Sequence, residues 1–318
     1  MRDLYLVSTI QPHSNNMNII ESFTPPLING VSASKVFLPN DLTVNTVFEY
    51  LCQHFPHIQP KEWQQRFADQ LIYAADGSIL TLESPYTANT HIFYYRFLAQ
   101  ETHVPFQHEI LYENEHLLVV DKPHFLTMTP TGQYVQETLL VRLKKQTGYE
   151  DLTPIHRLDR ETAGIVLFCK KPELRGIYQQ LFADRKVQKI YHAIAAYRAE
   201  LHFPQILQLH LEKGQPFYTM QINSEKPQNS ETLIELLEHN QHYAKYQLKP
   251  KTGKQHQLRV HLNYLGIPIL NDPFYPVVAH KADDDFEQPL QLLAKEIYFI
   301  DPVLNREMHF HSKFELTL

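Results

Sequence analysis

The chain has 318 residues, of which 43% are hydrophobic and 20% are charged, and this balance is typical of a globular protein and argues against extensive disorder. The formal net charge of −6 gives no general attraction to nucleic acid, and two cysteines do not supply a disulfide framework. The sequence has no run of about eighteen apolar residues and no signal-peptide pattern at its start, so we expect a cytoplasmic protein that does not contact a membrane.

The length corresponds to about two domains. Residues 1–35 contain Pro25-Pro26 and clusters of Ser and Asn, which predict an irregular amino-terminal extension. We expect residues 36–104 to form a small α/β amino-terminal domain and residues 105–318 to form a larger second domain.

The small domain shows two helical patterns followed by a strand–turn–strand pattern. Helices are predicted over 43–51 and 60–70, and a hairpin over 71–82 turns at Asp76-Gly77. Two short helices followed by a hairpin resemble the alpha-L RNA-binding domain. A purely structural cap is the alternative, and it is favoured by the presence of only two cations, Lys61 and Arg66, between residues 41 and 90.

The second domain is dominated by strand signals. These occur at 110–115, 116–123, 165–169, 189–197, 205–213, 217–222, 231–237, 242–249, 289–299 and 308–314. Helices are predicted at 135–147, 172–184 and 255–264. A succession of strands without intervening helices favours an α+β domain with a largely antiparallel sheet and flanking helices.

Positive charge is concentrated in two stretches of the second domain. Residues 156–198 contain nine Lys and Arg against four Asp and Glu, and residues 245–261 contain five Lys and Arg and no acid. If both stretches face one cleft, they would bind phosphate groups despite the acidic total. Two separately solvated faces are the alternative.

One charged loop precedes a strongly apolar strand. It reads His156-Arg157-Leu158-Asp159-Arg160-Glu161-Thr162-Ala163-Gly164 and leads into residues 165–169. A loop that enters a buried strand can hold its polar side chains rigidly. Asp159 lies between Arg157 and Arg160, whose charges would favour its ionised, nucleophilic form, although a solvated loop with local ion pairs is also consistent with this composition.

This loop resembles the His-Arg-Leu-Asp-x-x-Thr-Ser-Gly signature of the RluA-type pseudouridine synthases. Further similar motifs follow in the same order at 189–193 and 252–262, and Asp121-Lys122-Pro123 ends a strand as the first motif of the family does. The resemblance extends over roughly residues 109–316 and implies the pseudouridine synthase type of catalytic domain. The chain departs from the family at Ala163, Lys254-Gln255 and Leu293, which puts substrate preference in doubt more than reaction type.

The resemblance also implies roles for individual residues. Asp159 would be the nucleophilic carboxylate, Tyr191 would stack on the flipped uracil, and Arg259 would pair with Asp159. Contacts with RNA or the target nucleotide are implied for His156, Arg157, Leu158, Thr162, Lys189, Lys254 and Leu258. The implied enzyme is a monomer that isomerises uridine in structured RNA without cofactor or metal, with ribosomal RNA favoured and transfer RNA as the other candidate.

The same sequence leaves three other functions to consider. Nineteen histidines raise the idea of a metal enzyme, but His256 with His261, or His54 with His57, have no nearby Cys or carboxylate to complete a ligand set. A glycoside hydrolase would use Asp159 with Glu161 as its two carboxylates. The remaining alternative is a catalytically inactive RNA-binding assembly factor.

Overall fold

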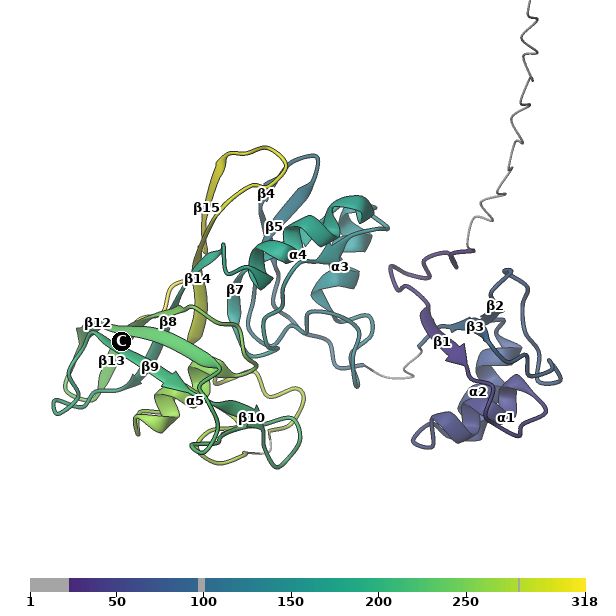
Figure 1. The fold of residues 1–318 in the computed structure, drawn as a ribbon, viewed down its shortest axis with the longest axis horizontal. Helices are drawn as coiled ribbons and strands as arrows, with labels where there is room; N and C mark the ends of the chain where they lie inside the picture. Colours follow the sequence, from purple (N-terminus) through teal and green to yellow (C-terminus); the bar gives the residue numbers. More distant parts are fainter. Residues whose placement is uncertain (1–22, 97–100, 280) are drawn as a thin grey trace, which may run out of the picture. The chain divides into compact units, whose positions relative to one another are not determined.

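A computed structural model of the chain describes residues 23–96, 101–279 and 281–318, and it forms two compact units (Figure 1). The first unit contains Ser32–Tyr95 and the described residues before Leu27, and the second contains Leu27–Val31 and Arg96–Leu318. The extension predicted for residues 1–35 lies mostly outside the described residues. Within the described ranges, the helices are all too short or too polar to cross a membrane.

The first unit packs two helices on a three-stranded antiparallel sheet. Its elements are β1 (Ser34–Leu38), α1 (Val47–His54), α2 (Pro60–Ala68), β2 (Ile72–Ala74) and β3 (Thr90–Tyr94), with the strand order β1-β3-β2. Thr46 begins α1 because its side-chain oxygen accepts a hydrogen bond from the Glu49 N–H, and Pro60 occupies the first turn of α2. The fully buried Trp63 lies in the core of this unit.

The predicted hairpin over residues 71–82 is only partly correct. Residues 72–74 form a strand and the chain turns after it, and the returning chain meets β2 at the bridge between Tyr73 and Ile79 and through backbone hydrogen bonds of residues 78 and 80. The main ladder of β2, however, is with β3. The reason is burial: β3 carries Ile92 and Tyr94 into the core, whereas Ile79 is 46% exposed. The strand with the buried face therefore forms the regular ladder with β2, and the exposed returning chain makes only a short contact.

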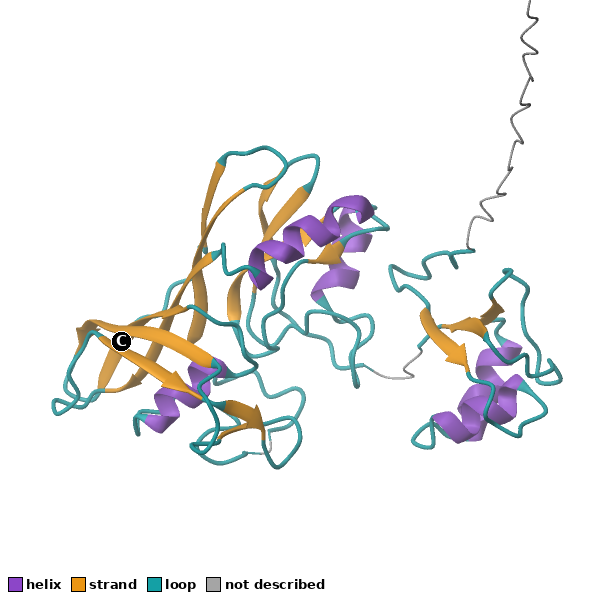
Figure 2. Ribbon diagram, in the orientation of Figure 1, coloured by secondary structure: helices purple, strands orange, loops and turns teal. Residues whose placement is uncertain are grey.

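The second unit is built on a ten-stranded sheet with few helices (Figure 2). Its strands are β4 (Glu109–Glu113), β5 (Leu117–Lys122), β6 (Thr153–Pro154), β7 (Ala163–Cys169), β8 (Gln188–Ala196), β9 (Gln205–Leu209), β12 (Ser230–His239), β13 (Tyr243–Pro250), β14 (Leu292–Ile300) and β15 (Glu307–His311), and a separate ladder joins β10 (Leu211–Lys213) to β11 (Met220–Ile222). Its helices are α3 (Leu139–Thr147), the single 3₁₀ turn η1 (Pro172–Leu174), α4 (Arg175–Ala183) and α5 (Gln257–Tyr264). The main path runs β4-β5-β7-β14-β8-β13-β12-β9, and every ladder is antiparallel except β7 with β14. The predicted α+β class with a largely antiparallel sheet is confirmed.

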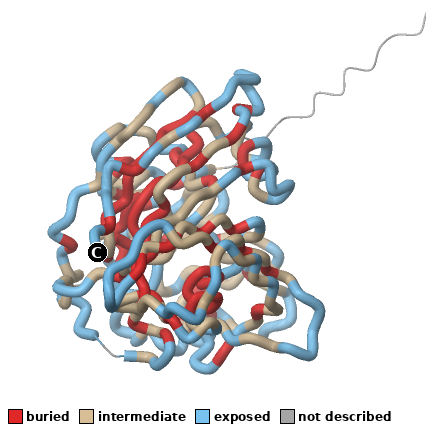
Figure 3. The backbone as a smooth tube through the Cα atoms, turned by 90° about the vertical axis from the view of Figure 1, so that its left-hand side faces the viewer, coloured by how far each residue is buried: buried red, intermediate tan, exposed pale blue. Residues whose placement is uncertain are grey.

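The middle of this sheet is buried on both faces, as the concentration of buried residues along its central strands shows (Figure 3). Successive residues of a strand face opposite sides. Val166 and Phe168 of β7 therefore pack with α3 in one hydrophobic cluster, whereas Ile165, Leu167 and Cys169 pack with α4 in another. A third cluster seats α5 against β8 and β13.

The junction of β7, β14 and β8 fixes the end of the loop over residues 156–164 relative to its neighbours. Gly164 has φ of 113°, and a Cβ at this position would collide with the backbone of Ala294 in β14. Only glycine allows so close an approach of two strands. Ala294 in turn is the register partner of both Gly164 in β7 and Tyr191 in β8, so the loop before β7 ends beside Tyr191.

Candidate active site

A cavity of about 100 Å³ lies where the loop before β7 meets β8 and the start of α5. Asp159, Tyr191 and Arg259 all line it. Of the residues for which substrate contacts were expected, Arg157, Leu158, Thr162, Lys189, Lys254 and Leu258 line it as well, and His156 does not. Three distant segments thus converge on one small cavity.

The carboxylate of Asp159 faces the guanidinium of Arg259. Arg259 donates from one terminal nitrogen to Oδ2 of Asp159 at 3.4 Å, and the side chains are 27% and 1% exposed for Asp159 and Arg259 respectively. Nε2 of His256 lies 3.7 Å from the same oxygen. Burial lowers the pKa of His256 to about 4, so this imidazole is neutral at neutral pH and Arg259 supplies the positive charge.

The expected role of the flanking arginines needs a correction for Arg160. Its guanidinium bonds to Glu161 at 2.8 Å and lies over the rings of Phe125 and Tyr134, away from the cavity. Asp159 would offer Arg160 an opposite charge as Glu161 does, but only the observed position also places the guanidinium over two aromatic faces. Arg157 does line the cavity and is exposed.

Arg259 is held by a carboxylate that sequence reasoning missed. Asp272 accepts from Nε of Arg259 at 2.8 Å and from the second terminal nitrogen at 2.6 Å, and its side chain is fully buried. Burial lowers the pKa of Arg259, and the hydrogen bonds and charge of Asp272 more than offset this, so its pKa lies above the ordinary value. This bidentate pair fixes the plane of the guanidinium and leaves one terminal nitrogen to face Asp159. In the sequence, Asn271-Asp272-Pro273 indicates only a turn.

Tyr191 completes the cavity from β8. Its ring is half-buried, and burial, followed by the charge of Asp159, raises its pKa above the usual value. The hydroxyl therefore stays protonated at neutral pH and is available as a hydrogen-bond donor. The ring also forms part of the wall of the cavity.

The loop that carries Asp159 is anchored from β5 by a second residue that was not predicted to act. Lys122 is fully buried, and its ammonium donates to the carbonyl oxygens of Pro123 and Leu126 at 2.9 Å and of Arg160 at 3.1 Å. Burial lowers its pKa to about 7. The bond to Arg160 ties the residue after Asp159 to the end of β5. The Asp-Lys-Pro motif marked this position in the sequence, but the motif alone did not predict which groups the Lys122 ammonium bonds to.

His156 supports the loop from behind. Its Nε2 accepts a hydrogen bond from the Leu167 N–H at 3.1 Å, and its ring stacks on Phe182 with centroids 4.6 Å apart. Burial lowers its pKa to about 3, so the ring is neutral and can accept this bond. The structure thus places His156 outside the small cavity, in contact with β7 and the end of α4, and in the wall of a larger cavity beside it.

A larger cavity of about 650 Å³ adjoins the first and shares six residues with it: Arg157, Lys189, Tyr191, Thr252, Gly253 and Lys254. It adds Arg185 and Lys251, so cations from both basic stretches of the sequence line one hollow. Burial lowers the pKa of Lys189. The arrangement agrees with the single basic cleft that the charge distribution suggested, and such a hollow suits a phosphate backbone.

The competing chemistries find little support in this region. Glu161 does not line the cavity with Asp159 and is paired with Arg160 instead. His256 bonds to the Tyr275 hydroxyl and His261 to the Ser230 hydroxyl, both at 2.9 Å, so these two histidines do not share a ligand position.

Comparisons with known proteins agree with the fold. A family model described as RNA pseudouridylate synthase matches residues 116–264. An uncharacterized RNA pseudouridine synthase of Mycoplasma pneumoniae is 32% identical over 66% of this chain and 67% of its own length. The ribosomal large subunit pseudouridine synthase C of Vibrio cholerae is 31% identical over 67% of each chain, and the mitochondrial tRNA pseudouridine(32) synthase of Saccharomyces cerevisiae is 32% identical over 52% of this chain and 37% of its own length.

Among solved structures, human RNA pseudouridylate synthase domain containing 1 superposes with a TM-score of 0.55 over 68% of this chain and 86% of its own, at 23% identity, which supports the fold. The fold is that of a pseudouridine synthase catalytic domain. The chain belongs to the RNA pseudouridine synthase family, and within it to the RluA type. It is an isomerase that acts on RNA.

Proposed function

We propose that this enzyme converts specific uridines of structured RNA to pseudouridine, with Asp159 as the nucleophile and ribosomal RNA as the favoured substrate. The observation that carries the proposal is the position of the Asp159 carboxylate, which faces the cavity between Tyr191 and an arginine fixed by a second carboxylate. Ribosomal RNA is favoured because the relative from V. cholerae named for the large subunit is matched over 67% of its length, against 37% for the yeast relative named for transfer RNA.

The reaction breaks the bond from uracil N1 to the ribose, turns the base, and joins C5 to the same sugar carbon. C5 loses a proton and N1 gains one, so no electron is transferred to or from the substrate. Attack by Asp159 on the nucleotide divides this exchange into easier steps. Arg259 holds the carboxylate in the direction of the cavity, and the protonated hydroxyl of Tyr191 is positioned to assist proton transfer while its ring stacks on the base.

The target nucleotide has to leave its helix to react. The small cavity, of about 100 Å³, is far too small for a duplex, so the proposal requires the uridine to be flipped out of its stack. In this proposal Arg157, at the rim, either fills the vacated place or pairs with a neighbouring phosphate. Lys189 and Lys254 line both cavities and would guide the backbone from the larger one to the smaller.

The remaining expectations concern the whole chain. The enzyme is proposed to act as a monomer. Residues 36–104 are proposed to assist RNA selection as an alpha-L-like domain, with a structural role as the alternative.

The deciding experiment is pseudouridine mapping of total RNA from a strain that lacks the protein, complemented by wild type, by Asp159→Asn or by Glu161→Gln. A site that is restored by wild type and Glu161→Gln but not by Asp159→Asn would establish reaction, nucleophile and substrate together. If no site changes while purified wild-type protein still binds RNA, the chain is an RNA-binding assembly factor. Loss of the site with Glu161→Gln as well would indicate that two carboxylates act.

A further inference from the structure

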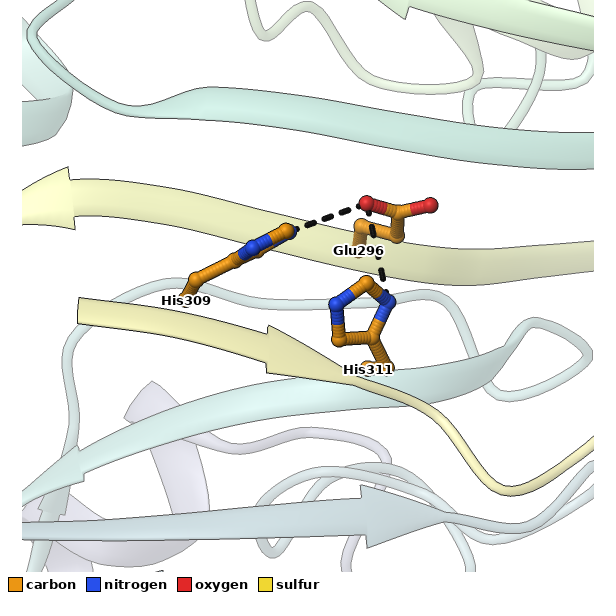
Figure 4. Close-up of side chains that lie close together, drawn as sticks. All are labelled: Glu296, His309 and His311. Carbon is orange, nitrogen blue, oxygen red and sulfur yellow. Dashed lines mark hydrogen bonds and ion pairs between the residues drawn. The ribbon is translucent and has the colours of Figure 1, made fainter.

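Two histidines and a glutamate meet on the hairpin formed by β14 and β15, as Figure 4 shows. Glu296 of β14 lies directly opposite His311 of β15, and His309 is two residues earlier on the same strand. Because side chains alternate along a strand, His309 and His311 project from the same face of the sheet. Register and alternation together therefore bring three ligating side chains to one point.

The distances fit a metal ion with few ligands. Nε2 of His309 and Nδ1 of His311 lie 3.0 and 3.6 Å from the same oxygen, Oε2 of Glu296. All three ligand atoms lie within 4.8 Å of one another. A tetrahedral Zn²⁺ ion with bonds of about 2.0–2.1 Å holds its ligands roughly 3.3 Å apart. Small side-chain rotations would thus place the three atoms around one ion.

The surroundings leave room for the ion and for one more ligand. The side chains of His309 and His311 are 48% and 55% exposed, and that of Glu296 is 23% exposed. A hollow of about 420 Å³ bounded by Gln188, Ile190 and Tyr298 adjoins Glu296 and His309. Lys295, the nearest basic neighbour in sequence, donates to the carbonyl oxygens of Ser312 and Phe314 instead of Glu296.

The donor set indicates the class of metal. Two imidazoles and one carboxylate are typical ligands of Zn²⁺ and its transition-metal neighbours, whereas Mg²⁺ and Ca²⁺ take oxygen ligands almost exclusively. Three protein ligands leave a fourth position open, as in exchangeable sites, and structural zinc sites are normally closed by four.

We propose that Glu296, His309 and His311 form a binding site for Zn²⁺ or a similar divalent transition-metal ion, with water in the fourth position. The bound ion ties β15 to β14, the strand whose register with β7 and β8 places Asp159 and Tyr191 in one cavity. None of the three ligands lines that cavity. The isomerisation itself therefore does not use the bound ion.

The test is isothermal titration of the full-length, untagged and chelator-treated protein with ZnCl₂. We expect one ion per chain at the site, and an affinity at least roughly tenfold lower in the double variant His309→Ala/His311→Ala and in Glu296→Gln. The matched control variant, His242→Ala, removes an exposed histidine from the loop between β12 and β13, and it is expected to bind Zn²⁺ as wild type does. Equal binding by wild type and the double variant, or none by wild type, would overturn the proposal.

A second measurement needs no variant and therefore does not depend on how the variants fold. Wild-type protein is treated with diethyl pyrocarbonate with and without stoichiometric Zn²⁺, and the modified histidines are located by mass spectrometry. Selective protection of His309 and His311 supports the site. Equal protection of all exposed histidines, or of none, contradicts it.

Discussion

Replacement of Asp272 by Asn tests whether Arg259 acts only when it is anchored. Both carboxylate oxygens of Asp272 bond to the guanidinium, and Oδ1 also accepts from the backbone N–H groups of Phe274 at 2.8 Å and Tyr275 at 3.2 Å. Asparagine has the same shape and keeps one oxygen for these backbone bonds. Its amide NH₂, however, meets another donor on Arg259, and the guanidinium loses its buried negative partner.

The magnitude follows from the burial of the pair. Removal of one partner from a buried ion pair destabilises a protein by about 3–5 kcal/mol. Arg259 retains a second carboxylate, Asp159, at 3.4 Å, so we expect a loss near the lower end, about 3 kcal/mol. We expect turnover to fall about 10- to 100-fold, which corresponds to roughly 1.4–2.7 kcal/mol in the barrier, because the guanidinium no longer has a fixed plane. Neither Asp272 nor Arg259 lines the larger cavity with the cluster of Lys and Arg side chains, so RNA affinity should stay close to wild type.

The assay is single-turnover pseudouridine formation with excess enzyme, combined with urea unfolding and an RNA-binding titration. Asp301→Asn is the matched control, because Asp301 is also fully buried and accepts from two following N–H groups, but its side-chain partner is the neutral hydroxyl of Tyr178. The control should lose stability and retain turnover in the folded fraction. If Asp272→Asn retained wild-type turnover while losing stability, the anchor would be purely structural and the reasoning refuted.

Three further outcomes are expected. Tyr191→Phe keeps the ring and removes the hydroxyl, so single-turnover rates should fall at least about tenfold while RNA affinity stays constant; an unchanged rate would show that the ring suffices. Burial lowers the pKa of His261 to about 4 from 6.5, so the unfolded state binds more protons between these values. The stability contributed by neutral His261 is thus fully present above pH 6.5 and is lost as the pH falls towards 4, by on the order of 3 kcal/mol. The free energy of unfolding in urea should therefore depend less on pH in His261→Gln than in wild type, and parallel pH profiles would contradict this. RNA affinity should fall as salt concentration rises. Arg157→Ala should reduce the slope of log Kd against log salt concentration by about 1, whereas Lys226→Ala should leave the slope unchanged because Lys226 does not line the larger cavity.

The fold class and the main elements of the second unit could be predicted because their signals are local. Alternating residues gave β8 and β13, and the helical spacing of Leu258 and Leu262 gave α5 within two residues of its observed start. The motif around Asp159, together with the two that follow it, indicated the family. The structure then brings Asp159, Tyr191 and Arg259 to one cavity.

The partners of these residues could not be predicted in the same way. Charge next to Asp159 in sequence suggested Arg160, yet Arg160 pairs with Glu161, and the positive charge comes from Arg259, 100 residues away. Likewise, the local sequence pattern did not predict that Asp272 pairs with Arg259, or that the ammonium of Lys122 bonds to the loop over residues 156–164. The local sequence around Asp272 predicts a turn, and that around Lys122 predicts the end of a strand, but neither identifies the residue with which the side chain interacts.

Sequence by itself therefore determined the family, the fold class and the segments that supply the site, because hydrophobic period and motif identity are properties of neighbouring residues. Only the tertiary structure decided which charges meet. The parallel register of β7 and β14 at Gly164 and the antiparallel register of β14 with β8 and β15 place Asp159 beside Tyr191 and Glu296 beside His309 and His311. Register between distant strands depends on the packing of the whole sheet, and a shift of one residue would turn each of these side chains to the opposite face.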